Sequence, residues 1–198
     1  PLFPDVTWIA LPENIGFGKA NNRGLEECNG RYVLFLNPDT IVGHDTLNVM
    51  VRYMDNEPSA GIAGCKVLNP DGSFQVACRR GLPTPWASFC KLFGLQSLFP
   101  ASPLFARYNL TYKPIDATYE VDALIGAFMV VRTDLVKQQG GFDPAFFMYG
   151  EDLDWAMAIR RAGWQVRYNP AVTVLHIKRA ASRQSHKAQI AFHEAMLY

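Results

Sequence analysis

The chain has 198 residues, of which 49% are hydrophobic and 19% are charged, and these proportions predict one compact domain over residues 1–198. The formal net charge of +1 excludes a general attraction to nucleic acid or to an anionic membrane. No apolar run reaches transmembrane length, and the N-terminus lacks the basic start and apolar core of a signal peptide.

The first half of the chain alternates strand and helix patterns. Residues 8–11 predict a strand, and residues 18–28 predict a helix that is followed by Asn-Gly, a pair that tolerates left-handed backbone. The continuous apolar run RYVLFL, residues 31–36, is typical of a strand that is buried on both faces. Asp45 is placed to cap a further helix, which ends before Pro58.

The second half continues the alternation, and the whole pattern predicts an α/β fold with a mostly parallel sheet and helices on both faces. The NPDG turn predicts a hairpin, and a pair of prolines opens an irregular stretch. The elements expected are, in order, hairpin strands 61–68 and 73–79, the irregular stretch 83–118, strand 121–132, helices 133–139 and 153–162, and two short strands before His176.

The cysteines and the chain ends indicate compartment and context. The chain opens without Met close to a predicted strand and stops inside a helical pattern, so both ends are expected to continue into a longer protein. The basic residues after His176 are typical of a solvated tail. Four cysteines lack the paired spacing of a metal site and indicate reduced thiols in the cytoplasm: Cys28, Cys65, Cys78 and Cys90.

Two polar segments follow predicted strands, where ligands of open α/β sheets bind. In NPDT, residues 37–40, Pro38 keeps the preceding residue extended and Asp39 lies on the loop at the strand end; the alternative is an ordinary turn or helix-entry Asp. In ENIGFGKANNRG, Gly16 and Gly18 allow a close backbone approach where a helix begins, as a phosphate-bearing ligand requires. Glycines before a helix are equally compatible with no ligand at all.

A third polar group follows the aromatic run FFMYG. One carboxylate is enough to cap a helix, so the three acids Glu151, Asp152 and Asp154 favour chemistry in a pocket that the aromatic residues help to enclose. His176 ends the apolar run VTVLH. It is either structural or, beside a carboxylate, part of a divalent-metal site.

These motifs resemble the family 2 glycosyltransferases, in particular the bacterial rhamnosyltransferase-like branch. The matching segments cover most of the chain in order: ENIGFGKANNRG, FLNPDT, IGAFMVVR, GGFDPAFFMYGEDLDWAMAIRRAGW and NPAVTVLHIKRAAS. The resemblance implies a GT-A fold and the inverting transfer of a sugar from a nucleotide diphosphate donor. The implied acceptor is a glycan or lipid-linked hydroxyl in cell-surface polysaccharide synthesis, and dTDP-rhamnose is the leading donor.

The resemblance also implies roles for single residues. Asp39 and His176 match the ligands of a divalent ion, Mg²⁺ or Mn²⁺, with Asn37 where many members carry the first Asp of the DXD motif. Asp152 matches the general base and Glu151 its neighbour. The residues expected along the nucleotide or near the donor sugar are Asn14, Gly18, Asn22, Asn37 and Gly126.

Elementary chemistry agrees with two separate acidic sites. A hydroxyl that attacks an anomeric carbon must lose its proton, and a carboxylate within reach accepts it. The leaving diphosphate gains negative charge, which a divalent ion offsets, and Mn²⁺ accepts imidazole more readily than Mg²⁺. Asp154 and Glu151 are expected to position the base or to cap its helix.

Departures from the family leave other functions open. The family begins with a strand and a base-binding stretch that precede the start of this chain, so the nucleotide-binding half is expected to be incomplete. The first alternative is a nucleotidyltransferase, which also combines a nucleotide, a metal and an α/β sheet. The second is a non-catalytic saccharide-binding relative, although Asp39, Asp152 and His176 argue against it.

The segment WASFCKLFGLQSLF, residues 86–99, carries many apolar residues and a single charge, Lys91. Its simplest interpretation is a helix packed on the sheet. The alternative is a partly exposed apolar surface that contacts a lipid-linked acceptor or the inner face of the cell membrane. Exposure of Trp86, Phe89 and Phe93 distinguishes the two.

Overall fold

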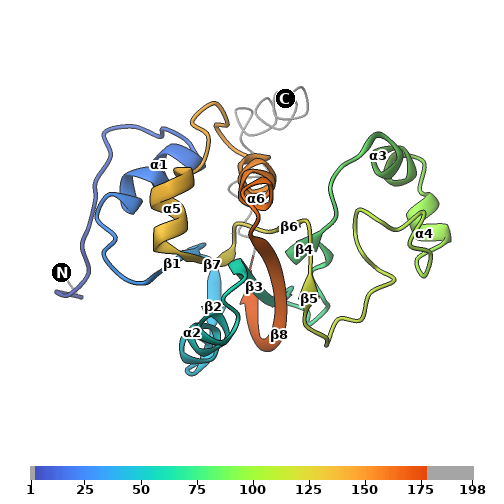
Figure 1. Ribbon diagram of the computed structural model, residues 1–198, viewed down its shortest axis with the longest axis horizontal. Helices are drawn as coiled ribbons and strands as arrows, with labels where there is room; N and C mark the ends of the chain where they lie inside the picture. The colour runs from blue at the N-terminus through green and yellow to red at the C-terminus, as the bar shows by residue number, and fades with distance from the viewer. Residues whose placement is uncertain (1–2, 178–198) are drawn as a thin grey trace.

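A six-stranded sheet forms the centre of the protein, whose residues 3–177 we describe from a computed structural model (Figure 1). The strand order is β1-β7-β3-β8-β2, and β5 also pairs with β8. A separate two-stranded sheet joins β4 and β6. The strands are β1 (Tyr32–Leu36), β2 (Thr40–Val42), β3 (Ala60–Leu68), β4 (Arg79–Arg80), β5 (Tyr119–Glu120), β6 (Ala123–Leu124), β7 (Phe128–Arg132) and β8 (Gln165–His176).

The sheet is mixed, so the expectation of a mostly parallel sheet is wrong. Strands β3 and β8 run parallel, whereas β7 lies antiparallel between β1 and β3. Strands β2 and β5 both pair antiparallel with β8. The α/β class itself is as expected; the order and direction of strands depend on long-range pairing that an apolar pattern does not encode.

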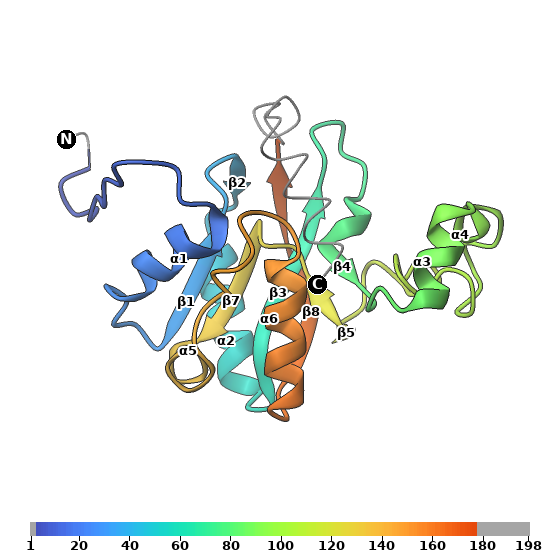
Figure 2. The ribbon, with the colours of Figure 1, turned by 90° about the horizontal axis from the view of Figure 1, so that it is seen from above.

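Helices cover both faces of the sheet, as predicted. Helices α1, α5 and α6 lie on one face and α2 on the other, while α3 and α4 project to one side (Figures 1 and 2). The helices are α1 (Phe17–Leu25), α2 (Thr46–Asn56), α3 (Pro85–Leu92), α4 (Leu95–Leu98), α5 (Thr133–Gln139) and α6 (Glu151–Arg161).

Aromatic packing fixes α6 on its face of the sheet. The ring of Phe35 from β1 lies 5.0 Å from that of Phe142 and 5.4 Å from that of Trp155, both in edge contacts. On the other face, Met50 and Met54 of α2 are fully buried. This packing holds the first turn of α6, which carries the acidic cluster, next to the sheet.

Several predicted strands differ from those observed. Residues 8–11 form no strand and are exposed, because no neighbouring strand supplies ladder bonds within the described residues. Strand β1 is an edge strand that buries only alternate residues, Val33 and Phe35, instead of both faces. The two short strands expected before His176 are one strand of 12 residues, β8, with a register shift opposite Cys65 and Lys66.

The predicted hairpin around NPDG and the predicted single strand over residues 121–132 do not form as expected. The NPDG turn forms, but only one bridge, Leu68 to Phe74, follows it, and the chain then enters a short 3-10 helix at Val76–Cys78. The strand expected over residues 121–132 is divided into β6 and β7 by a break at residues 125–127. The helix predicted over residues 133–139 has the bounds of α5, and Gly140 follows it with a φ of 80°.

Helix α1 is docked against the loop that precedes α6. Asn22 accepts a hydrogen bond from the Phe142 amide at 2.8 Å and donates one to the Phe142 carbonyl at 2.7 Å. Gly16 has a φ of 90°, and a Cβ there would lie 2.4 Å from the Phe147 carbonyl oxygen. Gly16 is therefore required by its packing on Phe147, and Gly18 lies in close contact with Phe142.

Residues 83–115 form a projection that we call the wing, which contains α3 and α4 and extends away from the sheet (Figure 2). Arg79, which is 1% exposed, anchors it by donating to the carbonyls of Leu110 at 2.9 Å and Lys113 at 3.1 Å. The Gly81 amide donates to the Tyr108 carbonyl at 2.8 Å. A buried guanidinium thus joins the wing to the core.

Candidate active site

The first polar cluster lies where β2 meets the end of β8. The antiparallel register places Thr40 opposite His176, and the Ile177 amide donates to the Asp39 carbonyl at 2.8 Å. As a result, Asp39 Oδ1 and His176 Nε2 are 3.2 Å apart, and Asn37 Nδ2 lies 3.5 Å from the same ring nitrogen. The expected convergence of Asp39 and His176, which are far apart in sequence, is present.

Gln75 orients the imidazole. Its Oε1 lies 3.1 Å from His176 Nδ1, and both side chains are buried. With Gln75 as acceptor, Nδ1 carries the proton, so in the neutral ring Nε2 presents its lone pair towards Asp39. A carboxylate and a fixed imidazole nitrogen side by side fit a divalent ion whose remaining ligands are phosphate and water oxygens. No group of three or more His, Cys, Asp or Glu side chains suited to a metal occurs within residues 3–177.

The second polar cluster lies at the start of α6. Arg80 Nη2 donates to Asp152 Oδ2 at 2.5 Å and to the Leu124 carbonyl at 2.9 Å. The Gly126 amide donates to the same Asp152 oxygen at 3.3 Å. Burial lowers the pKa of Arg80, but the charge and hydrogen bonds of Asp152 and Tyr108 together more than offset this, so the pKa is raised. Both partners of this ion pair are mostly buried.

The turn into α6 is strained, as is common at functional sites. Tyr149 has a φ of 69° and Gly150 a φ of 87°, so two successive residues adopt positive φ. Glu151 is 7% exposed, and its Oε2 has no hydrogen-bond partner among the described residues. Burial, and after it the charge of Asp152, raises the pKa of Glu151 to about 7. Near neutral pH Glu151 is therefore partly protonated, and its neighbour Asp152 forms the ion pair with Arg80.

The break between β6 and β7 connects the two clusters. The Gly126 amide bonds to Asp152, while the carbonyl of the next residue, Ala127, accepts from the Asn37 amide at 3.0 Å. Gly126 also faces α1, because a Cβ there would lie 3.3 Å from the Phe17 ring. The strand break at residues 125–127, which the sequence pattern did not predict, is therefore hydrogen-bonded to a residue of each cluster.

The residues expected along the nucleotide contact α1 and its surroundings. Asn14 Oδ1 accepts from the Gly16 amide at 3.0 Å, and Gly18 is buried against Phe142. Both polar atoms of the Asn22 side chain bond to the Phe142 backbone, so this side chain joins α1 to the loop that precedes α6.

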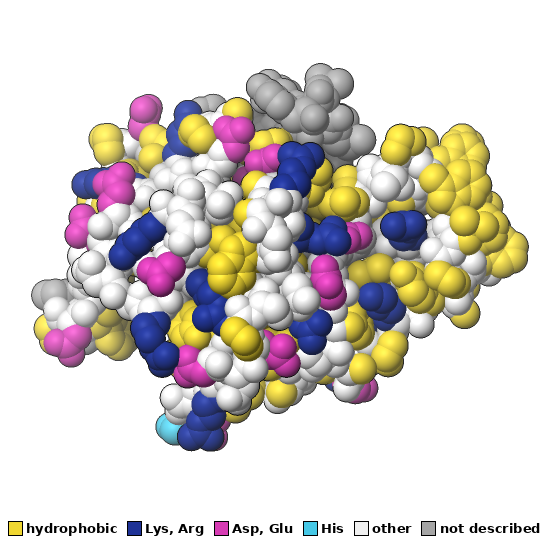
Figure 3. Space-filling model, in the orientation of Figure 1, with side chains coloured by type: hydrophobic (Ala, Val, Ile, Leu, Met, Phe, Trp, Pro, Cys, Tyr) yellow, Lys and Arg dark blue, Asp and Glu magenta, His cyan; other side chains and the backbone are white. Residues whose placement is uncertain are grey.

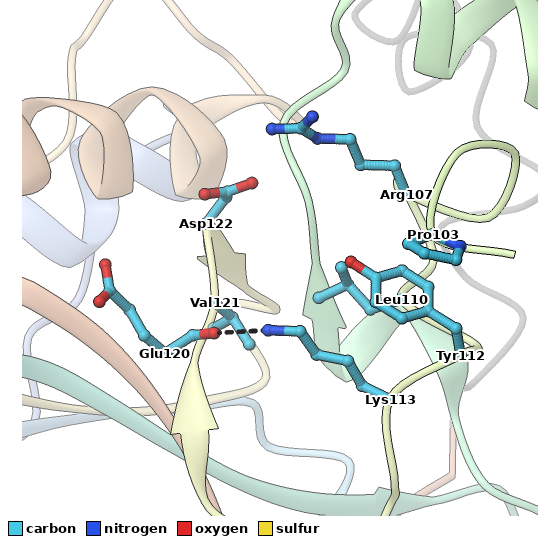
Figure 4. Close-up of a pocket in the computed structure, with 8 residues that line it drawn as sticks. All are labelled: Pro103, Arg107, Leu110, Tyr112, Lys113, Glu120, Val121 and Asp122. Carbon is cyan, nitrogen blue, oxygen red and sulfur yellow. Dashed lines mark hydrogen bonds between the residues drawn. The ribbon is translucent and has the colours of Figure 1, made fainter.

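A hollow of about 260 Å³ lies between the wing and β5, apart from both clusters (Figure 4). Arg107 and Lys113 enter it from the wing, and Glu120 and Asp122 from the core side. Asp122 is held by Arg160 of α6 at 2.5 Å and by the Leu82 amide at 3.0 Å. None of its lining residues comes from the Asp39 and His176 cluster.

Two site residues were not identified from the sequence. Arg80 lies in CRR, where two adjacent arginines that follow the run VAC are the only sequence signal. Gln75 gives no signal, because its partner His176 is 101 residues away.

The two polar clusters lie within a segment that matches a known protein family. Residues 3–191 match the family described as "Glycosyltransferase like family 2". The chain belongs to this family. The matching residues include both clusters, α1 and the wing.

Similar proteins support the same relationship. The chain is 26% identical to N-acetylglucosaminyl-diphospho-decaprenol L-rhamnosyltransferase of Mycobacterium tuberculosis, over 99% of this chain and 66% of that protein. It is 30% identical to rhamnosyltransferase WbbL of Escherichia coli (strain K12), over 81% of this chain and 60% of that protein. The chain therefore spans somewhat less than two-thirds of the length of these relatives.

Solved structures confirm the fold. The structure of GalNAc-T7 with UDP, GalNAc and Mn²⁺ aligns with a TM-score of 0.57 at 16% identity, covering 85% of this chain and 32% of that one. The structural neighbours are GT-A glycosyltransferases, so the expected GT-A fold is confirmed.

We predict that Glu151 makes stability depend on pH. Its pKa of about 7 in the folded chain exceeds the ordinary value of 4.5, so the folded state binds its proton more tightly. The resulting stabilisation is complete below about pH 4.5 and is lost as the pH rises through about 7. Between pH 5 and 8, the free energy of unfolding of the wild type should fall by up to about 3 kcal/mol relative to Glu151→Gln, measured by urea denaturation.

The exposed Glu27→Gln variant is the control, and its pH profile should run parallel to that of the wild type. If the profile of Glu151→Gln also runs parallel to the wild type, the buried proton is not on Glu151.

Proposed function

We propose that this chain is the catalytic region of an inverting glycosyltransferase that moves a sugar from a nucleotide diphosphate donor to an acceptor hydroxyl. The observation that carries the proposal is the pair of acidic clusters, Asp39 with His176 and Asp152 with Arg80, joined through residues 125–127. Their separation suits a reaction in which one site binds the leaving diphosphate and the other removes the proton of the attacking hydroxyl.

On the donor side, Asp39 Oδ1 and His176 Nε2 would hold Mn²⁺ or Mg²⁺, with Mn²⁺ preferred because one ligand is imidazole. Such an ion, when bound, offsets the negative charge that develops on the diphosphate. Gln75 keeps Nε2 directed at Asp39, and Asn37 adds an amide donor beside it. Gly126, at the strand break, lies beside the space proposed for the donor sugar.

On the acceptor side, Asp152 acts as the general base. Its Oδ2 accepts from Arg80 and Gly126, and its Oδ1 has no hydrogen-bond partner among the described residues, so it is available for the acceptor proton. The acceptor oxygen attacks the anomeric carbon as its proton passes to Asp152. The bond from that carbon to the phosphate oxygen breaks from the opposite side, and its electron pair leaves with the diphosphate, which inverts the configuration.

The proposed acceptor is a lipid-linked or free glycan hydroxyl in cell-surface polysaccharide synthesis, with rhamnose as the leading sugar. The names of the similar proteins support this choice, because one acts on a decaprenol-linked sugar and both transfer rhamnose. No helix within residues 3–177 is long and apolar enough to cross a membrane. Because the proposed acceptor is lipid-linked, we propose action in the cytoplasm at the inner face of the cell membrane, through peripheral contact.

The direct test uses the full-length protein that contains this chain. It should transfer sugar to a prenyl-diphosphate-linked acceptor from one member of a panel of nucleotide sugars, followed with radiolabelled donor. Pyrophosphate release from a nucleoside triphosphate would instead indicate a nucleotidyltransferase. Binding of glycan with no turnover of any donor would indicate a saccharide-binding relative.

Replacing Asp152 with Asn should lower turnover by about a hundredfold or more, because the amide keeps the shape but accepts no proton. The KM for the donor should change little. Asp134→Asn, exposed on α5, is the control of the same residue type and should retain most activity. Near-normal turnover of Asp152→Asn would overturn its assignment as the base.

Replacing Asp39 or His176 with Ala should weaken Mn²⁺-dependent binding of a nucleoside diphosphate by about tenfold or more, measured by calorimetry. The surface pair His44 and Asp45, with Nδ1 and Oδ1 3.3 Å apart, provides matched controls of the same residue types. His44→Ala and Asp45→Ala should bind like the wild type. Equal affinity in all four variants would remove the metal role from Asp39 and His176.

A further inference from the structure

The outer surface of the wing is a continuous apolar patch. It forms the yellow area at the far end of the molecule in Figure 3, over α3 and α4. We call it the aromatic patch, and its most exposed members are Leu92 at 82%, Leu98 at 71%, Phe93 at 62%, Phe99 at 50%, Trp86 at 44% and Phe89 at 44%. The interpretation of residues 86–99 as a helix packed on the sheet is therefore wrong.

The patch is an ordered surface. The rings of Trp86 and Phe89 are stacked with centroids 5.6 Å apart, and those of Phe89 and Phe93 are 4.5 Å apart. Trp86 Nε1 donates to the Leu104 carbonyl at 3.0 Å, which leaves its ring at the surface. Helix α3 buries only its small residues, Ala87 and Cys90, so its large side chains point outwards.

The charges of the wing are all of one sign. Residues 83–115 contain Lys91, Arg107 and Lys113 and no Asp or Glu, although the whole chain has nearly equal numbers of acids and bases. Lys91 lies within the patch sequence, with its ammonium 4.2 Å from the Tyr108 ring centroid. A surface that is apolar and exclusively basic is complementary to an anionic lipid interface.

Two other candidates for covering the aromatic patch, the protein's own core and a second copy of the chain, fit it less well than a lipid bilayer. The core does not cover the patch, because the rings are exposed and the wing extends away from the sheet (Figure 2). A second copy of this chain would bring like charges together if two wings met face to face. With eight and four residues, α3 and α4 are too short to span a bilayer but can lie in its plane.

We propose that the aromatic patch docks the protein in the interface of an anionic lipid bilayer. The large side chains enter the acyl boundary, and Lys91 meets the phosphate head groups. The proposal names the membrane-contact surface of the proposed function and rests on that function only for the lipid-linked acceptor.

Docking at this surface also orients the base. Strand β4 has two residues: Arg79 anchors the wing through Leu110 and Lys113, and Arg80 holds Asp152. The wing and the base are therefore joined by adjacent residues. A bilayer that binds the patch fixes the height and direction of Asp152 above the membrane, where a lipid-linked hydroxyl is presented.

Vesicle flotation of the full chain, without donor or acceptor, tests the docking. The chain should float with equimolar phosphatidylcholine–phosphatidylglycerol vesicles, and the double variant Leu92→Ser/Phe93→Ser should lower the partition coefficient by about tenfold or more. Leu47→Ser, on α2 and 50% exposed, is the matched control and should float like the wild type. Near-ultraviolet circular dichroism establishes that each variant is folded.

Two further comparisons sharpen the result. Lys91→Gln should reduce binding to the anionic vesicles, whereas Lys137→Gln, exposed on α5, should not. Quenching of tryptophan emission by brominated lipid should be lost in Trp86→Phe and retained in Trp8→Phe.

Equal flotation of Leu92→Ser/Phe93→Ser and Leu47→Ser would overturn the proposal. The proposal would also be overturned if the wild type formed a dimer that does not bind vesicles and if Leu92→Ser dissociated that dimer. No donor or acceptor sugar is present in these assays, so failure of the chain to float would not contradict the proposed transfer reaction. Likewise, absence of sugar transfer would not contradict the proposed docking.

Discussion

The pairing of β8 is the constraint on which the site depends. This strand runs parallel to β3 along its length and accepts β5 and β2 antiparallel on its other edge. Because side chains alternate between the faces of a strand, a slip of one residue between β2 and β8 would turn His176 away from Asp39. The 3.2 Å approach of these side chains is therefore a consequence of sheet register, which the buried core on both sides enforces.

The second constraint is the mostly buried ion pair between Arg80 of β4 and Asp152 of α6. Removing one partner of such a pair leaves an uncompensated charge in a low-dielectric environment, so Arg80 and Asp152 hold each other in position. Arg79 lies next in the chain and has a different task, since its guanidinium faces backbone carbonyls and the rings of Phe74, Tyr119 and Tyr168. Two adjacent arginines thus link an apolar projection to a carboxylate at the start of α6. The same arrangement places Glu151, whose pKa is raised by burial to about 7, beside the carboxylate that pairs with Arg80.

Local patterns predicted the elements whose determinants are local. Helix α5 was predicted with its observed bounds, and the NPDG turn was predicted correctly because Gly72 supplies the positive φ that it requires. Predictions failed where long-range contacts decide. Residues 8–11 have strand composition but pair with no strand within residues 3–177. The run 121–132 is interrupted because Gly126 and Ala127 bond to Asp152 and Asn37. The convergence of Asp39 and His176 was predicted only through resemblance to a family, whereas Gln75 and Arg80 were missed because their partners lie 101 and 72 residues away.

The central claim is that Asp39 and His176 bind one divalent ion together with the donor diphosphate. The most direct measurement is electron spin echo envelope modulation of Mn²⁺ bound, with a nucleoside diphosphate, to the chain labelled with ¹⁵N-histidine. The account predicts a ¹⁵N coupling from a coordinated imidazole that persists in His44→Ala and disappears in His176→Ala. Phosphorus coupling without any ¹⁵N coupling in the wild type, or a ¹⁵N coupling that survives His176→Ala, would contradict it.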